Sequence, residues 1–215
     1  MTKKQRALAV IDRLKKKYPD AICSLTYRKD YELLIATRLS AQCTDARVNV
    51  VTKDLFNVFP TVESFASAEL TQVEDIVKPC GLYKTKAKSI VEMCKILVEK
   101  YDGKVPGSME ELLSLPGVGR KTANLIMGDV FHAPAIVCDT HCIRITNLLG
   151  LTDTKDPAKC EEQLRKILPP EESSDLCHRF VLFGRETCVA RRPDCLNCVL
   201  KDVCQHGASL PTDNQ

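Results

Sequence analysis

Apolar residues recur at helical spacing along much of this chain, and this periodicity constrains the fold more than any other feature. Four stretches show apolar residues at three- and four-residue intervals: 7–18, 48–59, 87–101 and 160–167. Pro60 and Asp102-Gly103 stand where the second and third stretches should end, and Asp156-Pro157 stands where the fourth helix should begin. No stretch alternates polar and apolar residues between hairpin turns. The sequence therefore predicts an all-α protein.

The size and composition of the chain limit its class. Its 215 residues allow one large domain or two small ones, and 44% hydrophobic residues are enough for a buried core. No apolar run reaches the roughly 18 residues needed to span a bilayer, and the lysine-rich first residues do not resemble a signal peptide. The twelve cysteines are then expected to be reduced or metal-bound in a cytoplasmic protein. The net charge of +3 does not by itself indicate a nucleic-acid partner.

The segment 115–121, Leu-Pro-Gly-Val-Gly-Arg-Lys, predicts a tight turn between two helices. Gly117 and Gly119 permit backbone angles closed to other residues, so that N–H groups at a helix N-terminus can hold a phosphate. An ordinary interhelical turn is the alternative. Lys121 would begin the second helix, where the helix dipole, Arg120 and partial burial are expected to lower its pKa and make it nucleophilic. A plain phosphate contact is the simpler interpretation of this lysine.

Four cysteines near the C-terminus have the spacing of a metal centre: Cys188, Cys195, Cys198 and Cys204. Four thiolates suit tetrahedral zinc or a [4Fe–4S] cluster, and the spacing does not separate the two. Disulfides are a weaker third possibility. The other eight cysteines are most simply small buried apolar residues.

Asp139 follows an apolar segment and precedes a helical pattern that closes at Gly150. It can serve as a helix N-cap, present a carboxylate to a pocket, or do both. His141 is expected to be structural. The chain contains no Walker loop, dinucleotide fingerprint or nucleophile elbow, so we expect no nucleotide cofactor.

Taken together, segment 115–121, Asp139-Thr140-His141 and the four-cysteine run resemble endonuclease III, a family of the helix-hairpin-helix superfamily of DNA glycosylases. Segments 39–45 and 81–83 resemble that family as well. The resemblance implies a bilobal all-α fold, with a six-helix lobe at 22–134 carrying the hairpin. Residues 1–21 and 135–215 would form the second lobe, with a [4Fe–4S] cluster bound at 188–204. Family membership is the reason for choosing iron over zinc.

The resemblance also implies a reaction. The enzyme would remove an oxidised pyrimidine from duplex DNA after rotating the nucleotide out of the helix, as base excision repair requires. Gln42 would fill the vacated space, and Leu82 would wedge the opposite strand. Lys121 would attack C1′ and displace the base, with Asp139 stabilising positive charge on the sugar. The Schiff base would then lose the 3′ phosphate by β-elimination, so the enzyme would also be a lyase for abasic sites, without a catalytic metal ion.

DNA contacts follow from the same resemblance. The expected contacts come from the hairpin, from the first loop of the cysteine run and from the helix after Asp139: Gly117, Val118, Gly119, Arg120, Arg144, Arg191 and Arg192. The expected partner is damaged double-stranded DNA, with no membrane, and the protein is expected to be a monomer, associated with the nucleoid if prokaryotic.

Two alternatives and one hypothesis remain. A mismatch glycosylase of the same superfamily, acting on adenine or thymine through activated water, would lack the Schiff base, and Lys121 argues against it. A non-catalytic DNA-binding or electron-transfer protein would not need both Lys121 and Asp139. Cys43 beside Gln42 and Cys142 near Asp139 raise the hypothesis that oxidation of thiols reduces activity.

Overall fold

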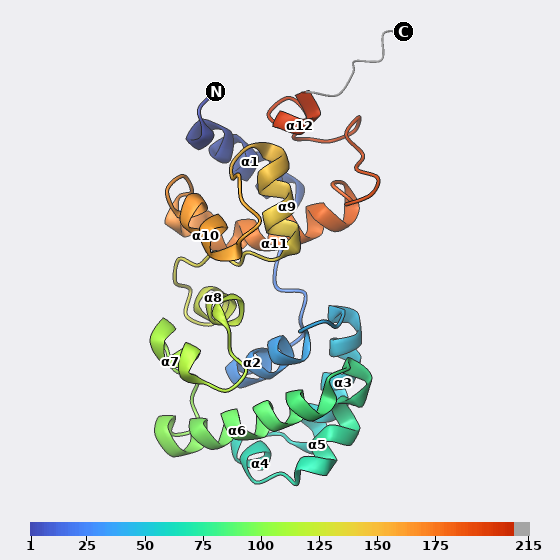
Figure 1. The fold of residues 1–215 in the computed structure, drawn as a ribbon, viewed down its shortest axis with the longest axis vertical. Coiled ribbons are helices and arrows are strands. Elements are labelled where there is room, and N and C mark those ends of the chain that lie inside the picture. The colour runs from blue at the N-terminus through green and yellow to red at the C-terminus, as the bar shows by residue number, and fades with distance from the viewer. Residues whose placement is uncertain (209–215) are drawn as a thin grey trace. The chain divides into compact units, whose positions relative to one another are not determined.

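The computed structural model describes residues 1–208, and every regular element among them is a helix (Figure 1). The elements are, in chain order, α1 (Lys3–Lys17), α2 (Asp30–Leu39), α3 (Asp45–Val58), α4 (Val62–Ala66), α5 (Leu70–Val77), η1 (Lys78–Cys80), α6 (Tyr83–Tyr101), α7 (Met109–Ser114), α8 (Arg120–Asp129), α9 (Thr140–Leu149), α10 (Pro157–Arg165), η2 (Pro170–Glu172), α11 (Ser173–Glu186) and α12 (Gln205–Ala208). The all-α prediction is confirmed. In this part of the chain no helix has both the length and the apolar character needed to cross a membrane.

The chain forms two compact units. The first, which we call the hairpin unit, is Cys23–His132, and the second, the cysteine unit, combines Met1–Ile22 with the chain from Ala133 onward. The resemblance implied lobes at 22–134 and at 1–21 with 135–215, and these bounds differ from this division by one or two residues.

The hairpin unit packs around the long helix α6, which contacts α2, α4 and α5. Its core includes an aromatic group in which Tyr31, Phe56 and Phe59 surround Phe65, with ring centroids 5.1 to 6.4 Å from that of Phe65. The unit holds seven α-helices, one more than the resemblance implied, and the short helix α4 begins at a capping box formed by Thr61. Helix α2 packs against α8, so this core supports the hairpin directly.

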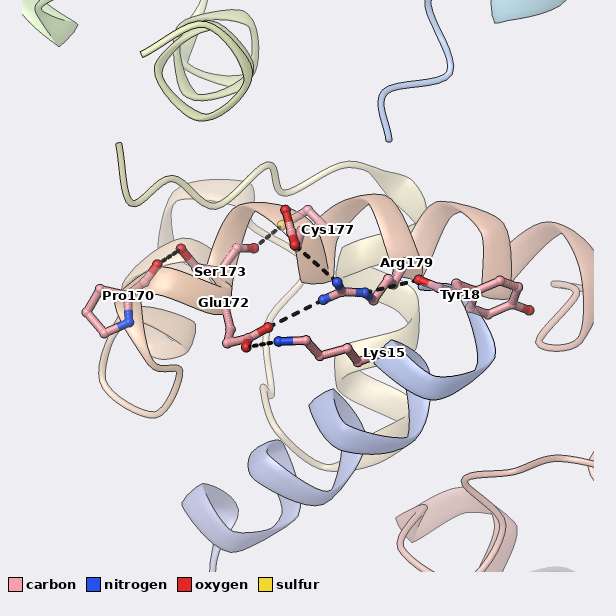
Figure 2. A network of polar contacts seen from close by, with 8 residues as sticks. Lys15, Tyr18, Pro170, Glu172, Ser173, Cys177 and Arg179 are labelled. Atoms are coloured by element: carbon pink, nitrogen blue, oxygen red, sulfur yellow. Dashed lines mark hydrogen bonds and ion pairs between the residues drawn. The ribbon is translucent and has the colours of Figure 1, made fainter. Parts of the chain in front are cut away.

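The cysteine unit joins the N-terminal helix to the last third of the chain through a buried arginine (Figure 2). Arg179 of α11 is 2% exposed and donates hydrogen bonds to Asp175 Oδ2 at 3.0 Å and to the backbone oxygen of Tyr18 at 3.4 Å. Glu172 accepts from Lys15 Nζ at 2.5 Å and from Arg179 Nη1 at 3.5 Å. A buried guanidinium is costly unless it is paired, so these contacts hold α1 against α11.

Candidate active site

Of the two glycines in the turn of the helix-hairpin-helix, Gly117 is required by the backbone and Gly119 is not. Gly117 has φ +78°, a left-handed conformation that strains other residues. A Cβ at this position would lie 2.5 Å from Arg38 Nε and 3.0 Å from Ser89 Cβ, so space excludes a side chain as well. Gly119 differs from the expectation: its φ is −101°, and a Cβ there would meet no atom within 4 Å. The absence of a side chain at Gly119 therefore leaves open space above the turn.

Helix α8 begins at this open space without a side-chain cap. Gly119 is its N-cap residue and offers no side-chain acceptor, and the first turn has no acidic residue. The backbone N–H groups and the positive end of the helix dipole can therefore attract an anion. Val118 does not contribute to this anion site. Its side chain is buried, and its backbone N–H donates a hydrogen bond to the backbone oxygen of Leu115 at 3.1 Å. Val118 shapes the turn, and its N–H is already used within the protein.

Lys121 lies in the first turn of α8 beside Arg120, and both side chains are exposed. The partial burial expected for Lys121 is absent, because its side chain extends from the surface of the hairpin unit into solvent. The ammonium group makes no hydrogen bond or ion pair with the described residues. An unpaired amine next to an uncapped helix N-terminus is available to whatever anion or electrophile binds there.

Gln42 and Leu82 occupy two loops of the same unit, and both have left-handed backbones, with φ 56° and 48°. This conformation costs a non-glycine residue roughly 1–2 kcal/mol, and in natural proteins such strain concentrates at functional sites. Leu82 is also 58% exposed, so it is not the core leucine that its residue type suggests. Two strained and exposed side chains on neighbouring loops are suited to insertion into a partner.

Lys86 holds these two loops together, and no sequence motif marks this residue. Its side chain is fully buried in α6, and Nζ donates to the backbone oxygens of Leu39 and Cys80, both at 2.8 Å. Leu39 lies three residues before Gln42, and Cys80 lies two before Leu82. Burial lowers the pKa of Lys86. Its place one residue before Ala87 and four before Ile90, both on the buried face of α6, was the signal that could have revealed it.

Asp139 lies in the cysteine unit and is the N-cap of α9. Its Oδ1 accepts the backbone N–H of Cys142 at 2.7 Å, whereas Oδ2 makes no hydrogen bond within the described chain. The side chain is half-buried. The capping interpretation is thus correct, and the cap fixes the carboxylate while one oxygen stays available for chemistry.

The four C-terminal cysteines line one cavity of the cysteine unit. About 420 Å³ of atom-free space, part of it open to solvent, lies between their thiols and the apolar side chains of α9 and α11 that complete the lining: Ile145, Leu148, Leu149 and Phe183. Each thiol is half-buried, and burial raises the pKa of Cys188, Cys195 and Cys198. Metal binding would have to displace these protons.

The separation of these sulfurs distinguishes between a single ion and a cluster. Around one tetrahedral zinc ion the sulfurs would lie about 3.8 Å apart, given zinc–sulfur bonds of about 2.3 Å. Among the described residues, no three of the four C-terminal sulfurs lie within 4.8 Å of one another. In a polynuclear cluster each cysteine binds a different iron, so the sulfurs stand farther apart. The donor set and the cavity therefore fit an iron–sulfur cluster better than one zinc ion.

The three arginines proposed for DNA contact have different surroundings. Arg191 and Arg192 are exposed in the loop between the first two cysteines. Arg144 is half-buried in α9, and its Nη1 lies 3.4 Å from Cys188 Sγ. The Arg144 guanidinium lowers the pKa of Cys188, against the larger effect of burial. Arg144 is thus directed at the cysteine centre in this structure.

The two thiols behind the oxidation hypothesis differ in access. Cys142 has no exposed surface, and hydrogen bonds with the neighbouring thiols, together with burial, raise its pKa. Peroxide reacts with accessible thiolates, so the structure does not support oxidation at Cys142. Cys43 is half-buried and hydrogen-bonds with Cys80, and burial and this contact raise the pKa of Cys80 to about 11. Cys43 is the more accessible of the two positions.

Known proteins resemble the chain over nearly its whole length. Residues 35–170 match the family described as HhH-GPD superfamily base excision DNA repair protein. Endonuclease III from Synechocystis sp. is 43% identical over 204 residues, covering 94% of this chain and 93% of that protein. A solved structure of a trapped endonuclease III–DNA covalent intermediate is 44% identical with a TM-score of 0.90, covering 97% of this chain and 98% of that one. A thermostable thymine-DNA glycosylase, 20% identical with a TM-score of 0.85 over 96% of this chain and 98% of that one, shares the fold. The chain therefore belongs to the HhH-GPD superfamily of base excision DNA repair proteins and, within it, to the endonuclease III family.

Proposed function

We propose that this DNA glycosylase is bifunctional, removing oxidised pyrimidines from duplex DNA and nicking the abasic site that remains. The observation that carries the proposal is the exposed, unpaired amine of Lys121 beside the uncapped N-terminus of α8. A phosphate at that N-terminus would bring the DNA backbone to the amine. DNA binding would also supply the burial that Lys121 lacks in the free protein, and desolvation favours the neutral, nucleophilic amine.

Extrusion of the damaged nucleotide is assigned to the loops that Lys86 joins. Rotating a nucleotide out of the duplex costs a few kcal/mol of stacking and pairing. Gln42 is proposed to occupy the vacated position, and Leu82 to wedge between bases of the other strand. Their strained backbones favour this assignment. The free-energy cost of the left-handed conformation is already met in the free protein, where each side chain is held outward in the absence of DNA.

The chemistry is a substitution followed by an elimination. Lys121 Nζ forms a bond to C1′ as the bond from C1′ to the base breaks, and the departing base takes the bonding electrons and a proton. Opening of the sugar ring gives the Schiff base. Loss of a C2′ proton then expels the 3′ phosphate, which breaks the strand. The role assigned to the Asp139 carboxylate is to stabilise the positive charge on the sugar and to assist the proton transfers of the lysine amine.

The four C-terminal cysteines are proposed to bind a [4Fe–4S] cluster. When bound, such a cluster supplies a rigid cross-link of the loop through four thiolates and a centre able to exchange one electron. The chain's own part is to present Arg191 and Arg192 from this loop to phosphates. Arg144 stabilises the thiolate of Cys188. We assign the protein as a monomer that acts on damaged double-stranded DNA in the cytoplasm.

Separate assays of base release and strand nicking test the bifunctional assignment. On a duplex with one thymine glycol, the wild-type protein should release the base and nick the strand together. Lys121→Ala should lose both activities and still bind the duplex. Base release without nicking by the wild-type protein would instead indicate a monofunctional glycosylase.

Asp139→Asn separates the chemical role of this residue from its structural one. Asparagine is also a good N-cap, so the hydrogen bond from the Cys142 N–H is retained while the charge is lost. We expect unchanged unfolding and a strongly reduced rate of base release. Asp139→Ala should in addition lose about 1 kcal/mol of stability through the missing cap. Equal activity of Asp139→Asn and wild type would remove the carboxylate from the mechanism.

A further inference from the structure

A second group of cysteines lies inside the cysteine unit, separate from the C-terminal run. Cys138, Cys142 and Cys160 place their sulfurs within 4.8 Å of one another. The thiol of Cys177 hydrogen-bonds with that of Cys142, so it joins the same group. We call these four residues the inner cysteines. From the sequence they were expected to be separate buried apolar residues, and the proposed reaction uses none of them.

The inner cysteines come from three helices of the cysteine unit. Cys138 precedes α9, Cys142 lies in its first turn, Cys160 lies in α10 and Cys177 lies in α11. Their exposed fractions are 8%, 0%, 0% and 5%, so they meet within the core. Chance packing of small apolar residues does not require cysteine from each of three helices at a single point.

Three of the inner sulfurs have a spacing close to that around a single tetrahedral ion. Sulfurs bound to one zinc ion lie about 3.8 Å apart, given zinc–sulfur bonds of about 2.3 Å. The sulfurs of Cys138, Cys142 and Cys160 lie within 4.8 Å of one another, and Cys177 adds a fourth thiol through its hydrogen bond with Cys142. Among the described residues, no three of the C-terminal sulfurs meet the same limit. The two cysteine groups of this unit thus differ in the size of the group that they fit.

A backbone N–H and a hydroxyl already contact two of the inner sulfurs. The backbone N–H of Val137 donates to Cys177 Sγ at 3.3 Å, and the hydroxyl of Thr146 lies 3.8 Å from Cys160 Sγ. Such contacts orient metal ligands and offset part of the negative charge of thiolates. A buried site also favours the ion that leaves the least net charge. For the same number of thiolates, a divalent ion leaves one negative charge fewer than a monovalent ion such as Cu⁺.

We propose that the inner cysteines form a binding site for one divalent thiophilic ion, with zinc as the ion that fits best. The site would cross-link α9, α10 and α11 at the point where the chain enters α9. Asp139 lies between two of the ligands, and its Oδ1 accepts the N–H of Cys142. Zinc binding would therefore hold the catalytic carboxylate in place, and its role at this site is structural.

Metal analysis of the full-length protein tests the proposal. The protein is produced in zinc-supplemented medium and purified without chelators, and zinc and iron are counted per chain. X-ray absorption at the zinc edge then reports the ligands of zinc alone, whatever iron is present. We expect one bound zinc with sulfur ligands at about 2.3 Å. Wild-type protein that retains no zinc, or zinc ligated by oxygen and nitrogen, would overturn the proposal.

Reciprocal variants locate the ion. Cys160→Ser should lose zinc and keep iron, and Cys198→Ser should keep zinc. Cys94→Ser, which changes a buried thiol of the hairpin unit, is the matched control and should keep both metals. If zinc is instead lost from Cys198→Ser and kept by Cys160→Ser, the ion occupies the C-terminal run and the proposal is wrong. Should Cys160→Ser fail to fold, the zinc content of Cys198→Ser and of wild type still decides the question.

Discussion

Replacing Lys86 by methionine tests how the two inserting loops are held. Methionine keeps the length of the buried stem and removes the ammonium group. The backbone oxygens of Leu39 and Cys80, each 2.8 Å from Nζ, would then lose a charged donor inside the core. The substitution changes no residue assigned to the reaction, so its effects report on the position of the loops.

The magnitude follows from these two contacts. A hydrogen bond to a charged group contributes roughly 1.5–3 kcal/mol, so the pair contributes about 3–6 kcal/mol. Removing the ammonium also relieves the cost of burying it, the same cost that lowers the pKa of Lys86. We expect Lys86→Met to lower the free energy of unfolding by about 2–4 kcal/mol.

Urea unfolding measures this loss, and Lys84→Met is the matched control because Lys84 is exposed in the same helix. Lys86→Met should also bind lesion-containing duplex more weakly relative to undamaged duplex, since Gln42 and Leu82 lose their common anchor. Lys84→Met should leave both properties nearly unchanged. The reasoning is refuted if Lys86→Met unfolds within 1 kcal/mol of wild type, approximately the net value of a single neutral hydrogen bond.

Three further predictions concern the hairpin, the pH dependence of stability and oxidation. Gly117→Ala should lower the free energy of unfolding by about 1–3 kcal/mol in urea titrations, whereas Gly119→Ala should leave it nearly unchanged and weaken DNA binding, as filter or gel assays would show. Burial and a hydrogen bond to a glutamate raise the pKa of Tyr18 to about 12 from 10.0. The stability that this shift provides is present below pH 10 and is lost between pH 10 and 12, so wild type should lose more stability across this range than Tyr18→Phe. In a peroxide titration Cys142→Ser should lose activity in parallel with wild type, whereas Cys43→Ser should resist; resistance of Cys142→Ser instead would contradict the burial argument.

Helices with one apolar face and clear ends were predictable from the sequence, whereas fully buried ones were not. α6 has a buried stripe and ends at Asp102-Gly103, both with positive φ, as the sequence indicated. α2 is buried on nearly every side, so it has no polar face for a periodicity argument to detect. The apolar periodicity of α11 is broken in another way. Arg179 lies on its apolar face, and this arginine can be buried because it is paired with acidic residues.

The site could be predicted only in part for a related reason. Short motifs identified the hairpin and the cysteine run, because the residues that form each of these sites lie close together in the sequence. The bonds of Lys86 join residues up to 47 positions apart, and the inner cysteines meet only after three helices pack. Helical spacing could not show either. The resemblance to endonuclease III supplied Gln42 and Leu82, and only the structure shows that both have strained backbones.

Borohydride trapping tests the central claim, that the amine of Lys121 forms a Schiff base with DNA. The wild-type protein and Lys121→Ala, both shown to be folded and to bind DNA, are mixed with a labelled duplex carrying one thymine glycol and reduced. We expect a covalent protein–DNA band for wild type that requires the lesion and is absent for Lys121→Ala. A band of equal intensity from Lys121→Ala would assign the chemistry to another amine, and no band from wild type that still binds the duplex would contradict amine catalysis altogether.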